Sequence, residues 1–214
     1  FGLVSGIAAY LAGASKIVLP ESGQGIFGPV LVTSSAQAYQ DYRSHPLFAR
    51  RMERFLTALL KRPLHFLFPR IWLTKGETLK AYTALPGSDD WRETRSCWQN
   101  ARHCSLNGEL VQCGVCAACM LRRMSIHAAG LQDNESGYAC SNLRADTFEE
   151  GIQPGFNMRG TALREYAIAG TQHLDHLADL TLPINRSVVK RHALVASEAI
   201  GMASSEAEEK LLAM

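Results

Sequence analysis

The chain lacks any apolar run long enough to cross a membrane. A membrane-spanning helix needs about 18 or more consecutive apolar residues, and no such run occurs among the 214 residues. A strong charge of either sign is also missing, because the net charge at pH 7 is +2. A near-neutral chain gives no electrostatic reason to expect a nucleic-acid partner. We therefore expect a globular protein that has no membrane partner.

Three common catalytic motifs are absent as well. The sequence contains no Gly-x-x-x-x-Gly-Lys-Ser/Thr loop, no Gly-x-Ser-x-Gly turn and no His-Glu-x-x-His helix. Gly23, Gly25 and Gly28 do match Gly-x-Gly-x-x-Gly after an expected strand. A dinucleotide site needs a helix that opens on the last glycine, whereas Pro29 and β-branched residues follow here. We therefore expect a flexible loop, which continues through a long polar segment up to Pro46.

A disulfide framework is not indicated either. Six cysteines in 214 residues are too sparse for the scaffold of a small secreted domain. Four of them have the spacing of metal ligands, while Cys104 and Cys140 stand apart. A reducing cytoplasm is the simplest location for such a chain.

The metal-ligand pattern consists of Cys113, Cys116 and Cys119 in a C-x2-C-x2-C knuckle, with Cys97 upstream. Two thiolates spaced in this way can hold one ion from a tight turn, and the third can come from the first turn of a following helix. Four thiolates leave no open coordination position, so the pattern predicts a structural zinc site. Cys104 is an alternative fourth ligand, because it lies nearer to the knuckle than Cys97.

Two further features adjoin the knuckle. Gly114 keeps the turn small enough for backbone N–H groups to point at the sulfur atoms. Arg122 and Arg123 follow directly. They either belong to a solvated helix face or offset the negative charge of a four-thiolate site.

Hydrophobic patterning predicts an α/β fold. Short buried strands are expected at residues 16–20 and 64–68. Helices are expected at residues 2–13, 46–61, 75–84, 117–129, 159–180, 184–201 and 204–214. The alternation of helices and strands in the first part is typical of a parallel sheet.

Two sets of charged residues could bind a ligand. Asp41 and Arg43 lie two residues apart in the long polar segment, so an extended backbone would point them the same way. Such a pair could bind a polar heterocycle or a phosphate, or it could be a surface ion pair of little energetic weight. Lys75 opens a helix, where a lysine is electrostatically misplaced unless an anion lies near or the side chain points into water.

Taken in order, the motifs of residues 1–131 resemble those of the 7-cyano-7-deazaguanine synthase (QueC-like) family. The resemblance rests on Glu21-Ser22-Gly23 after the first strand, Tyr-x-Asp-x-Arg at Tyr39, Asp41 and Arg43, Thr-Lys-x-Glu at Thr74, Lys75 and Glu77, Ser-Cys-aromatic at Ser96, Cys97 and Trp98, and Cys-Gly-x-Cys-x-x-Cys-x-x-Arg from Cys113 to Arg122.

The resemblance implies a fold and a division of the chain. The fold is a Rossmann-like PP-loop (adenine nucleotide alpha hydrolase) domain with a parallel sheet. Residues 1–90 would be its C-terminal part, residues 91–131 a four-cysteine zinc region, and residues 132–214 a loop plus a helical extension. The family's phosphate-binding loop would lie upstream of Phe1. We therefore expect a fragment of a longer protein, inactive on its own.

The resemblance also implies an activity. ATP with Mg²⁺ would activate a carboxylate on a deazapurine, ammonia would displace the activated group, and a second activation would give a nitrile. The residues implied to contact the substrates are Glu21, Tyr39, Asp41 and Arg43 for the acceptor, and Lys75 for the ATP phosphates or the end of the sheet. The metal ligands implied are Cys97, Cys113, Cys116 and Cys119.

Three departures from the family pattern indicate a divergent branch. The gap between Cys97 and Cys113 is longer than is typical, Tyr42 stands where cysteine is common, and a helical tail follows residue 150. The chain is similar in this to QueC-like proteins of anti-phage defence clusters, whose acceptor could be a protein or peptide carboxylate, or nucleic acid, in place of the free base. A second copy or a defence-complex protein is then the expected partner. Two alternatives stay open: a non-catalytic zinc-knuckle interaction module, and a PP-loop tRNA thiolase that would use Cys104 or Cys140.

Overall fold

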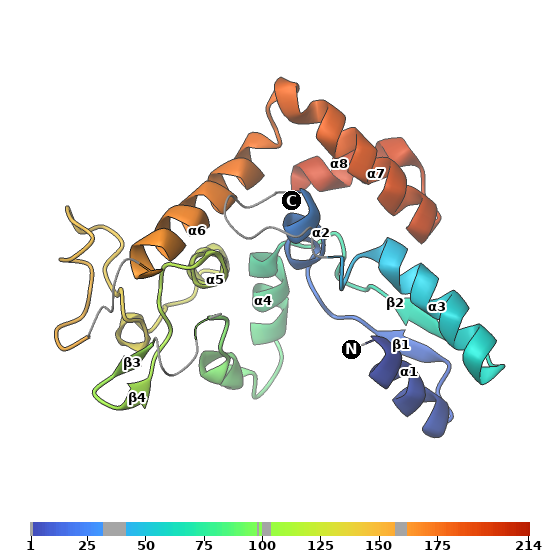
Figure 1. The fold of residues 1–214 in the computed structure, drawn as a ribbon, viewed down its shortest axis with the longest axis horizontal. Coiled ribbons are helices and arrows are strands. Elements are labelled where there is room, and N and C mark those ends of the chain that lie inside the picture. Colours follow the sequence, from blue (N-terminus) through green and yellow to red (C-terminus); the bar gives the residue numbers. More distant parts are fainter. Residues whose placement is uncertain (1, 32–41, 98, 100–103, 157–161) are drawn as a thin grey trace. The chain divides into compact units, whose positions relative to one another are not determined.

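A computed structural model describes residues 2–31, 42–97, 99, 104–156 and 162–214 (Figure 1). The chain forms two compact units. Unit 1 contains the described parts of Phe1–Thr33 and Gln37–Thr74, together with Leu177–Met214, and unit 2 contains those of Lys75–His176. Unit 1 is thus assembled from both ends of the chain. In the part that the structure describes, every helix is too short or too polar to span a bilayer.

The sheet of unit 1 is small and parallel. Strands β1 (Lys16–Val18) and β2 (His65–Leu67) pair with Ile17 opposite Phe66. Both strands were predicted, but β1 is not buried as expected, since Val18 is 56 % exposed. The reason is that helices α1 (Gly2–Leu11) and α3 (Pro46–Leu60) pack on the face that carries Ile17 and Phe66. Among the described residues the sheet has these two strands, so the architecture is mixed α/β and mostly helical.

Helix α3 confirms the helix predicted at residues 46–61. His45 caps it, because the Leu47 N–H donates to His45 Nδ1 at 3.1 Å. Phe55, an apolar residue of this helix, is 53 % exposed. The buried face carries Leu56 and also Glu53, and the Glu53 carboxylate accepts a hydrogen bond from the Phe66 N–H at 2.5 Å. A buried carboxylate that fixes the neighbouring strand cannot be read from hydrophobic periodicity.

Helix α2 (Gly23–Leu31) replaces the flexible loop that we expected after β1. Ser22 starts it: its hydroxyl accepts from the Gly25 N–H at 3.4 Å, and its carbonyl accepts from the Ile26 N–H at 3.0 Å. Gly23 is needed because a Cβ there would collide with the Ile71 carbonyl oxygen. The prediction was wrong because the burial of Phe27 depends on the far end of the chain.

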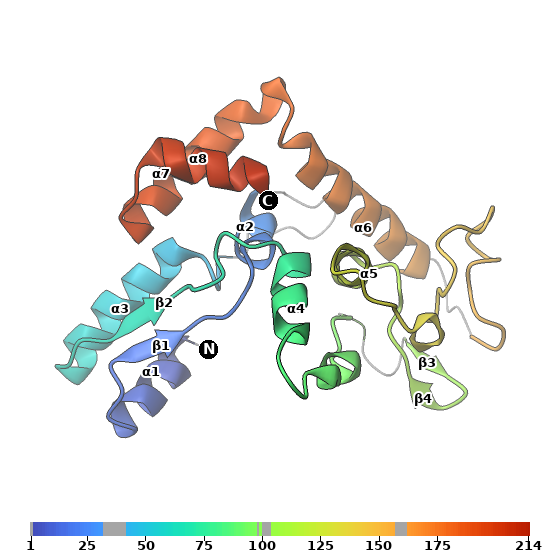
Figure 2. The same cartoon turned by 180° about the vertical axis from the view of Figure 1, so that it is seen from behind.

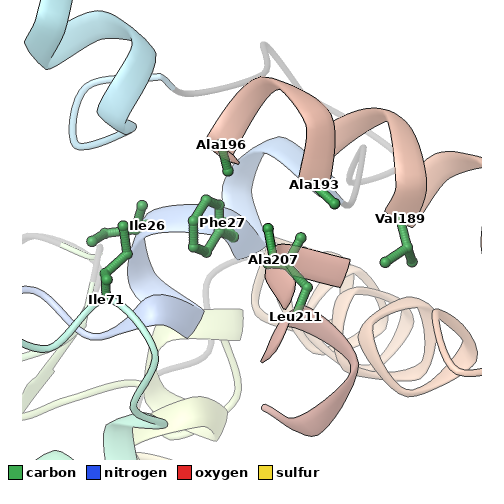
Figure 3. Close-up of a cluster of buried hydrophobic side chains, with 8 residues drawn as sticks. All are labelled: Ile26, Phe27, Ile71, Val189, Ala193, Ala196, Ala207 and Leu211. Atoms are coloured by element: carbon green, nitrogen blue, oxygen red, sulfur yellow. The ribbon is translucent and has the colours of Figure 1, made fainter. Parts of the chain in front are cut away.

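The far end supplies the main core of unit 1 (Figure 3). Helices α7 (Arg186–Ile200) and α8 (Ser204–Ala213) follow a short turn, η3 (Pro183–Asn185), and confirm two predicted helices. The buried members of this apolar core are Ile26, Phe27, Ile71, Val189, Ala193, Ala196, Ala207 and Leu211. Phe27 also stacks on Trp72, with ring centroids 5.6 Å apart. The C-terminal helices are therefore part of the core of unit 1.

Unit 2 is built around helices α4 (Lys75–Thr83), α5 (Ala117–Ala128) and α6 (Ala162–Asp179), all predicted. Helix α4 lies beside α5 (Figure 2), in close contact at Gly76 and Ala128. Two short turns, η1 (Asp89–Glu93) and η2 (Glu135–Gly137), lie in the predicted loops. A hairpin of β3 (Ser105–Leu106) and β4 (Glu109–Leu110) was not predicted.

Candidate metal centre

The four cysteines predicted as metal ligands come together in unit 2. The sulfur atoms of Cys97, Cys113, Cys116 and Cys119 all lie within 4.8 Å of one another. The Cys113 and Cys119 sulfur atoms are 3.8 Å apart. A tetrahedral zinc site with Zn–S bonds of about 2.3 Å has S···S edges of about 3.8 Å. The donor set and its spacing therefore fit a four-thiolate zinc ion.

The knuckle owes its shape to the backbone around Gly114. Gly114 has φ +82°, and a Cβ at this position would collide with the Cys140 carbonyl oxygen. The turn lets the Cys116 N–H donate to the Cys113 sulfur at 3.3 Å, as the sequence predicted. Helix α5 then starts at Ala117, which puts Cys119 in its first turn. Three ligands thus come from seven consecutive residues.

The fourth ligand, Cys97, is held to the knuckle by two separate contacts. The Gln112 side-chain oxygen accepts hydrogen bonds from the backbone N–H groups of Ser96 (2.9 Å) and Cys97 (3.3 Å). The Cys113 N–H donates to the Cys97 sulfur at 3.2 Å. Gln112 precedes the knuckle directly, so one residue positions the distant ligand. Cys97 is half-buried, whereas the knuckle cysteines are at most 1 % exposed.

Arg122 and Arg123 fasten the loops around the site. Arg122 donates to the Thr94 hydroxyl at 2.6 Å and to the Trp91 carbonyl at 3.2 Å, just upstream of Cys97. Arg123 donates to the carbonyls of Cys140 (2.9 Å) and Ser141. Helix α6 covers the other side, because Gly170 approaches the Val115 carbonyl so closely that a Cβ would collide with it. Both arginines therefore donate hydrogen bonds to the loops around the site. They do not belong to a solvated helix face, which was one of the two alternatives that the sequence left open.

Without a cation the cluster does not favour four thiolates. Hydrogen bonds from neighbouring thiols, that of Cys104 first, hold the pKa of Cys97 far below its usual range. Hydrogen bonds with the Cys113 and Cys116 thiols raise the pKa of Cys119. Sulfur atoms this close together repel one another when ionised, and a divalent cation is the group that stabilises all four as thiolates.

The two remaining cysteines are buried. Cys104 is 0 % exposed and Cys140 is 2 % exposed. Burial raises the pKa of Cys140, and a hydrogen bond with Cys97 raises that of Cys104. A sulfur nucleophile needs access and a low pKa. This geometry therefore disfavours the tRNA thiolase alternative.

The structure describes only some of the residues that were predicted to bind substrates. Tyr39 and Asp41 lie outside the described residues, as does Trp98. Glu21 precedes α2 and its carboxylate lies over Gly25 in the first turn. Arg43 lies in the turn before α3, also in unit 1, whereas Lys75 is the first residue of α4 in unit 2. Their roles in substrate binding stay predictions.

A buried histidine pair in unit 1 was missed by the sequence analysis. His45 is 0 % exposed, His192 is 5 % exposed, and the Nε2 atom of each is buried without a hydrogen-bond partner among the described residues. Burial and then the charge of His192 lower the pKa of His45 to about 4. Burial also lowers the pKa of His192. The position of His192 among Val189, Ala193 and Ala196 on α7 was the available signal.

Comparison with known proteins gives two matches. The family model described as queuosine biosynthesis protein QueC matches residues 24–130, a segment that includes all four clustered cysteines. The 7-cyano-7-deazaguanine synthase of Anaeromyxobacter sp. (strain Fw109-5) is 35 % identical over 100 residues, which cover 44 % of this chain and 38 % of that protein. The match thus spans less than half the length of the curated relative. No solved structure gives a significant match.

Proposed function

Because the chain belongs to the queuosine biosynthesis protein QueC family, we propose that the protein is an ATP-dependent ligase-type enzyme that activates a carboxylate for attack by ammonia. The observation that carries the proposal is the four-cysteine cluster inside the family match. The similarity to a 7-cyano-7-deazaguanine synthase supports a deazapurine carboxylate as the acceptor. ATP with Mg²⁺ is the proposed source of activation, with release of AMP and pyrophosphate.

The fold proposed for the catalytic domain is the Rossmann-like PP-loop fold. The parallel pairing of β1 with β2 supports it, because the described part of the connection between these strands contains helices α2 and α3. Such domains bind ligands outside the carboxyl ends of their strands. Glu21 follows β1 at that end, which supports its proposed place at the acceptor.

The metal ion has a structural role in this proposal. Cys97, Cys113, Cys116 and Cys119 would hold zinc as a closed site, and the bound ion would supply a cross-link between the Cys97 segment and α5. Four protein ligands leave no position for a substrate. The chemistry therefore falls to the nucleotide site, with Tyr39, Asp41 and Arg43 proposed to orient the acceptor and Lys75 to contact the ATP phosphates. A guanidinium and a carboxylate together match a heterocycle that offers both donors and acceptors.

The proposal is tested with the full-length, zinc-loaded protein. It is incubated with ATP, Mg²⁺, ammonia and 7-carboxy-7-deazaguanine, and the products are identified by mass spectrometry. We expect the amide and then the nitrile, with AMP formed in step. Arg43→Ala should remove product formation while the zinc content stays unchanged, because Arg43 lies in unit 1.

Two other outcomes would redirect the proposal. AMP formation without the nitrile, restored by a protein or peptide carboxylate, would move the acceptor class to that of a divergent, defence-associated branch. Zinc-loaded protein that forms no AMP with either acceptor would contradict the enzyme proposal and favour a non-catalytic zinc-knuckle interaction module. Measuring AMP separately from the nitrile keeps these outcomes distinct.

A further inference from the structure

His45 occupies a position where a smaller residue would be sufficient to cap helix α3. Its Nδ1 accepts a hydrogen bond from the Leu47 N–H at 3.1 Å, and its carbonyl accepts the first hydrogen bond of the helix, from the Ala49 N–H at 3.1 Å. Aspartate, asparagine, serine and threonine are the usual caps, because a short side chain with an oxygen acceptor serves this purpose. The imidazole ring therefore requires a further explanation.

The ring carries a donor that is buried and unpaired in the described part of the chain. Burial and then the charge of His192 lower the pKa of His45 to about 4, so the ring is neutral at pH 7. Because Nδ1 is an acceptor, the proton of the neutral ring is on Nε2. This Nε2 is buried without a hydrogen-bond partner among the described residues. A buried donor without a partner destabilises a fold, so the ring must make other contacts that offset the loss.

Those contacts are edge-on packing against two aromatic side chains. The Tyr42 ring lies 5.2 Å from the His45 ring, centroid to centroid, and the Phe27 ring lies 5.5 Å from it. Aromatic pairs in such edge-to-face arrangements are stabilised beyond the apolar area that they bury. Phe27 belongs to the apolar core of unit 1, together with Ala193 and Ala196 of α7 (Figure 3). His45 thus joins Tyr42 to the core that the C-terminal helices complete.

Tyr42 is the first residue of a turn that presents Arg43. The His45 N–H donates to the Tyr42 carbonyl at 3.0 Å, which closes a turn with Arg43 and Ser44 at its centre. Arg43 is exposed in this turn, whereas Tyr42 is half-buried and His45 is fully buried. His45 therefore contacts the first residue of the turn twice, with its backbone N–H and with its ring.

Helix α7 supports this arrangement from the C-terminal part of the chain. It packs against Phe27, on which the His45 ring rests. It also contacts α3 directly, because Arg50 Nε donates to the Ala199 carbonyl at 2.7 Å. Both the ring of His45 and the helix that His45 caps are thus held by α7.

We propose that His45 is a positioning residue for the acceptor substrate: its ring fixes the turn that carries Arg43, so that the guanidinium is held where the acceptor binds. The inference rests on the proposed function, in which Arg43 orients the acceptor. A residue on an exposed loop positions a substrate well only when a rigid support fixes its backbone. A misplacement of about 1 Å can cost about 100-fold in rate, so the support affects catalysis without touching the substrate.

The first experiment separates the ring from the cap. Steady-state rates are measured with the full-length, zinc-loaded protein, Mg²⁺ and ammonia, while 7-carboxy-7-deazaguanine and then ATP are varied. His45→Asn keeps a cap and loses the ring, so we expect its KM for the acceptor to rise about tenfold or more, with the KM for ATP unchanged. His45→Phe keeps a ring and loses the cap, so its KM for the acceptor should stay within about twofold of that of the unaltered protein.

Leu56→Ala is the matched control for a loss of stability alone. Leu56 is 0 % exposed on the same helix and packs in a different cluster, with Leu64 and Phe66. A smaller fraction of folded protein lowers the measured rate and leaves KM unchanged, so Leu56→Ala should keep the KM for the acceptor. An unchanged KM in His45→Asn, an equal rise in Leu56→Ala or an equal rise in His45→Phe would each overturn the proposal.

Hydrogen exchange tests the turn independently of activity. The amide of residue 45 donates across the turn, so its protection factor should fall about tenfold or more in His45→Asn and stay close to the original in His45→Phe. Unchanged protection in His45→Asn, in a protein that forms AMP, would contradict this inference and leave the proposed function standing. Lost protection in His45→Asn, together with an unaltered protein that forms no AMP, would contradict the proposed function and the acceptor role of the turn with it.

Discussion

The two units bury their interiors in chemically different ways. The core of unit 1 consists of apolar side chains from α2, α7 and α8 around Phe27. The centre of unit 2 consists largely of cysteine thiols within reach of one another. Apolar burial stabilises a fold by about 25 cal/mol per Å² without any bound ion. A thiol cluster gains its stability when a cation allows all four sulfur atoms to ionise. Unit 1 should therefore be independent of metal, and unit 2 should depend on it.

The largest expected effect is the loss of a central ligand. Cys116→Ser should lose zinc and unfold unit 2, because metal-binding energy is folding energy in such sites. Unit 1 should keep its core, which contains none of the ligands. Metal analysis together with amide hydrogen exchange measures both units at once. Cys140→Ser is the control for the loss of a buried thiol. Retained protection of α5 in zinc-free Cys116→Ser would contradict the structural role of the metal.

Phe27→Ala is the converse experiment on unit 1. Phe27 is 1 % exposed and packs against Trp72 and His45. Its truncation should lower the free energy of unfolding of unit 1 by about 3–5 kcal/mol, while the zinc content stays unchanged. Denaturant unfolding followed by tryptophan fluorescence gives the first quantity and metal analysis the second. Phe55→Ala, at a 53 % exposed position, should change stability by about 0.5 kcal/mol or less. Similar losses of stability in the two variants would contradict the assignment of Phe27 to the core of unit 1.

Acid should weaken unit 1 through its histidines. The pKa of His45 falls from 6.5 to about 4 on folding, so between these values the unfolded chain binds a proton that the folded chain does not. Stability is therefore complete above about pH 6.5 and declines toward pH 4, by up to about 3 kcal/mol for His45. Denaturant unfolding at several pH values measures the decline. His45→Asn keeps a side-chain acceptor for the Leu47 N–H and should show a shallower decline. If stability declined with pH equally steeply in His45→Asn, His45 would not be the cause of the decline.

The smallest effect is expected at the edge of the metal centre. The Thr94 hydroxyl accepts from Arg122 and donates to the Trp91 carbonyl at 2.6 Å. Thr94→Val should destabilise unit 2 by about 1 kcal/mol, since the site is exposed and water replaces part of the loss. Thr94→Ser keeps the hydroxyl and should be close to neutral. The midpoint of thermal unfolding of the zinc-loaded protein distinguishes the two. Equal midpoints would show that the Arg122 contact adds nothing to unit 2.

Local patterns were sufficient for most elements and for the ligand set. Helices α3, α5, α6, α7 and α8 were predicted because their sequences carry helical periodicity, and the knuckle because two-residue spacing between cysteines has few structural uses. Helix α2 was not predicted, because Ile26 and Phe27 become buried only through contacts with α7 and α8, about 170 residues away. Glu53 and His192 are polar residues on buried faces, and the Phe66 N–H that donates to Glu53 comes from another element, β2.

The sequence by itself determined which residues can hold a metal ion and which family the chain resembles, because thiolate ligands and their spacing are properties of a short local segment. Tertiary structure decided the rest. It placed α7 and α8 in the core of unit 1, and it fixed Cys97 to Gln112 and Cys113. It also buried Cys104 in the same cluster as the knuckle cysteines, directly before a hairpin that periodicity does not reveal. Contacts between distant segments depend on the shape of the assembled chain, and no local pattern encodes that shape.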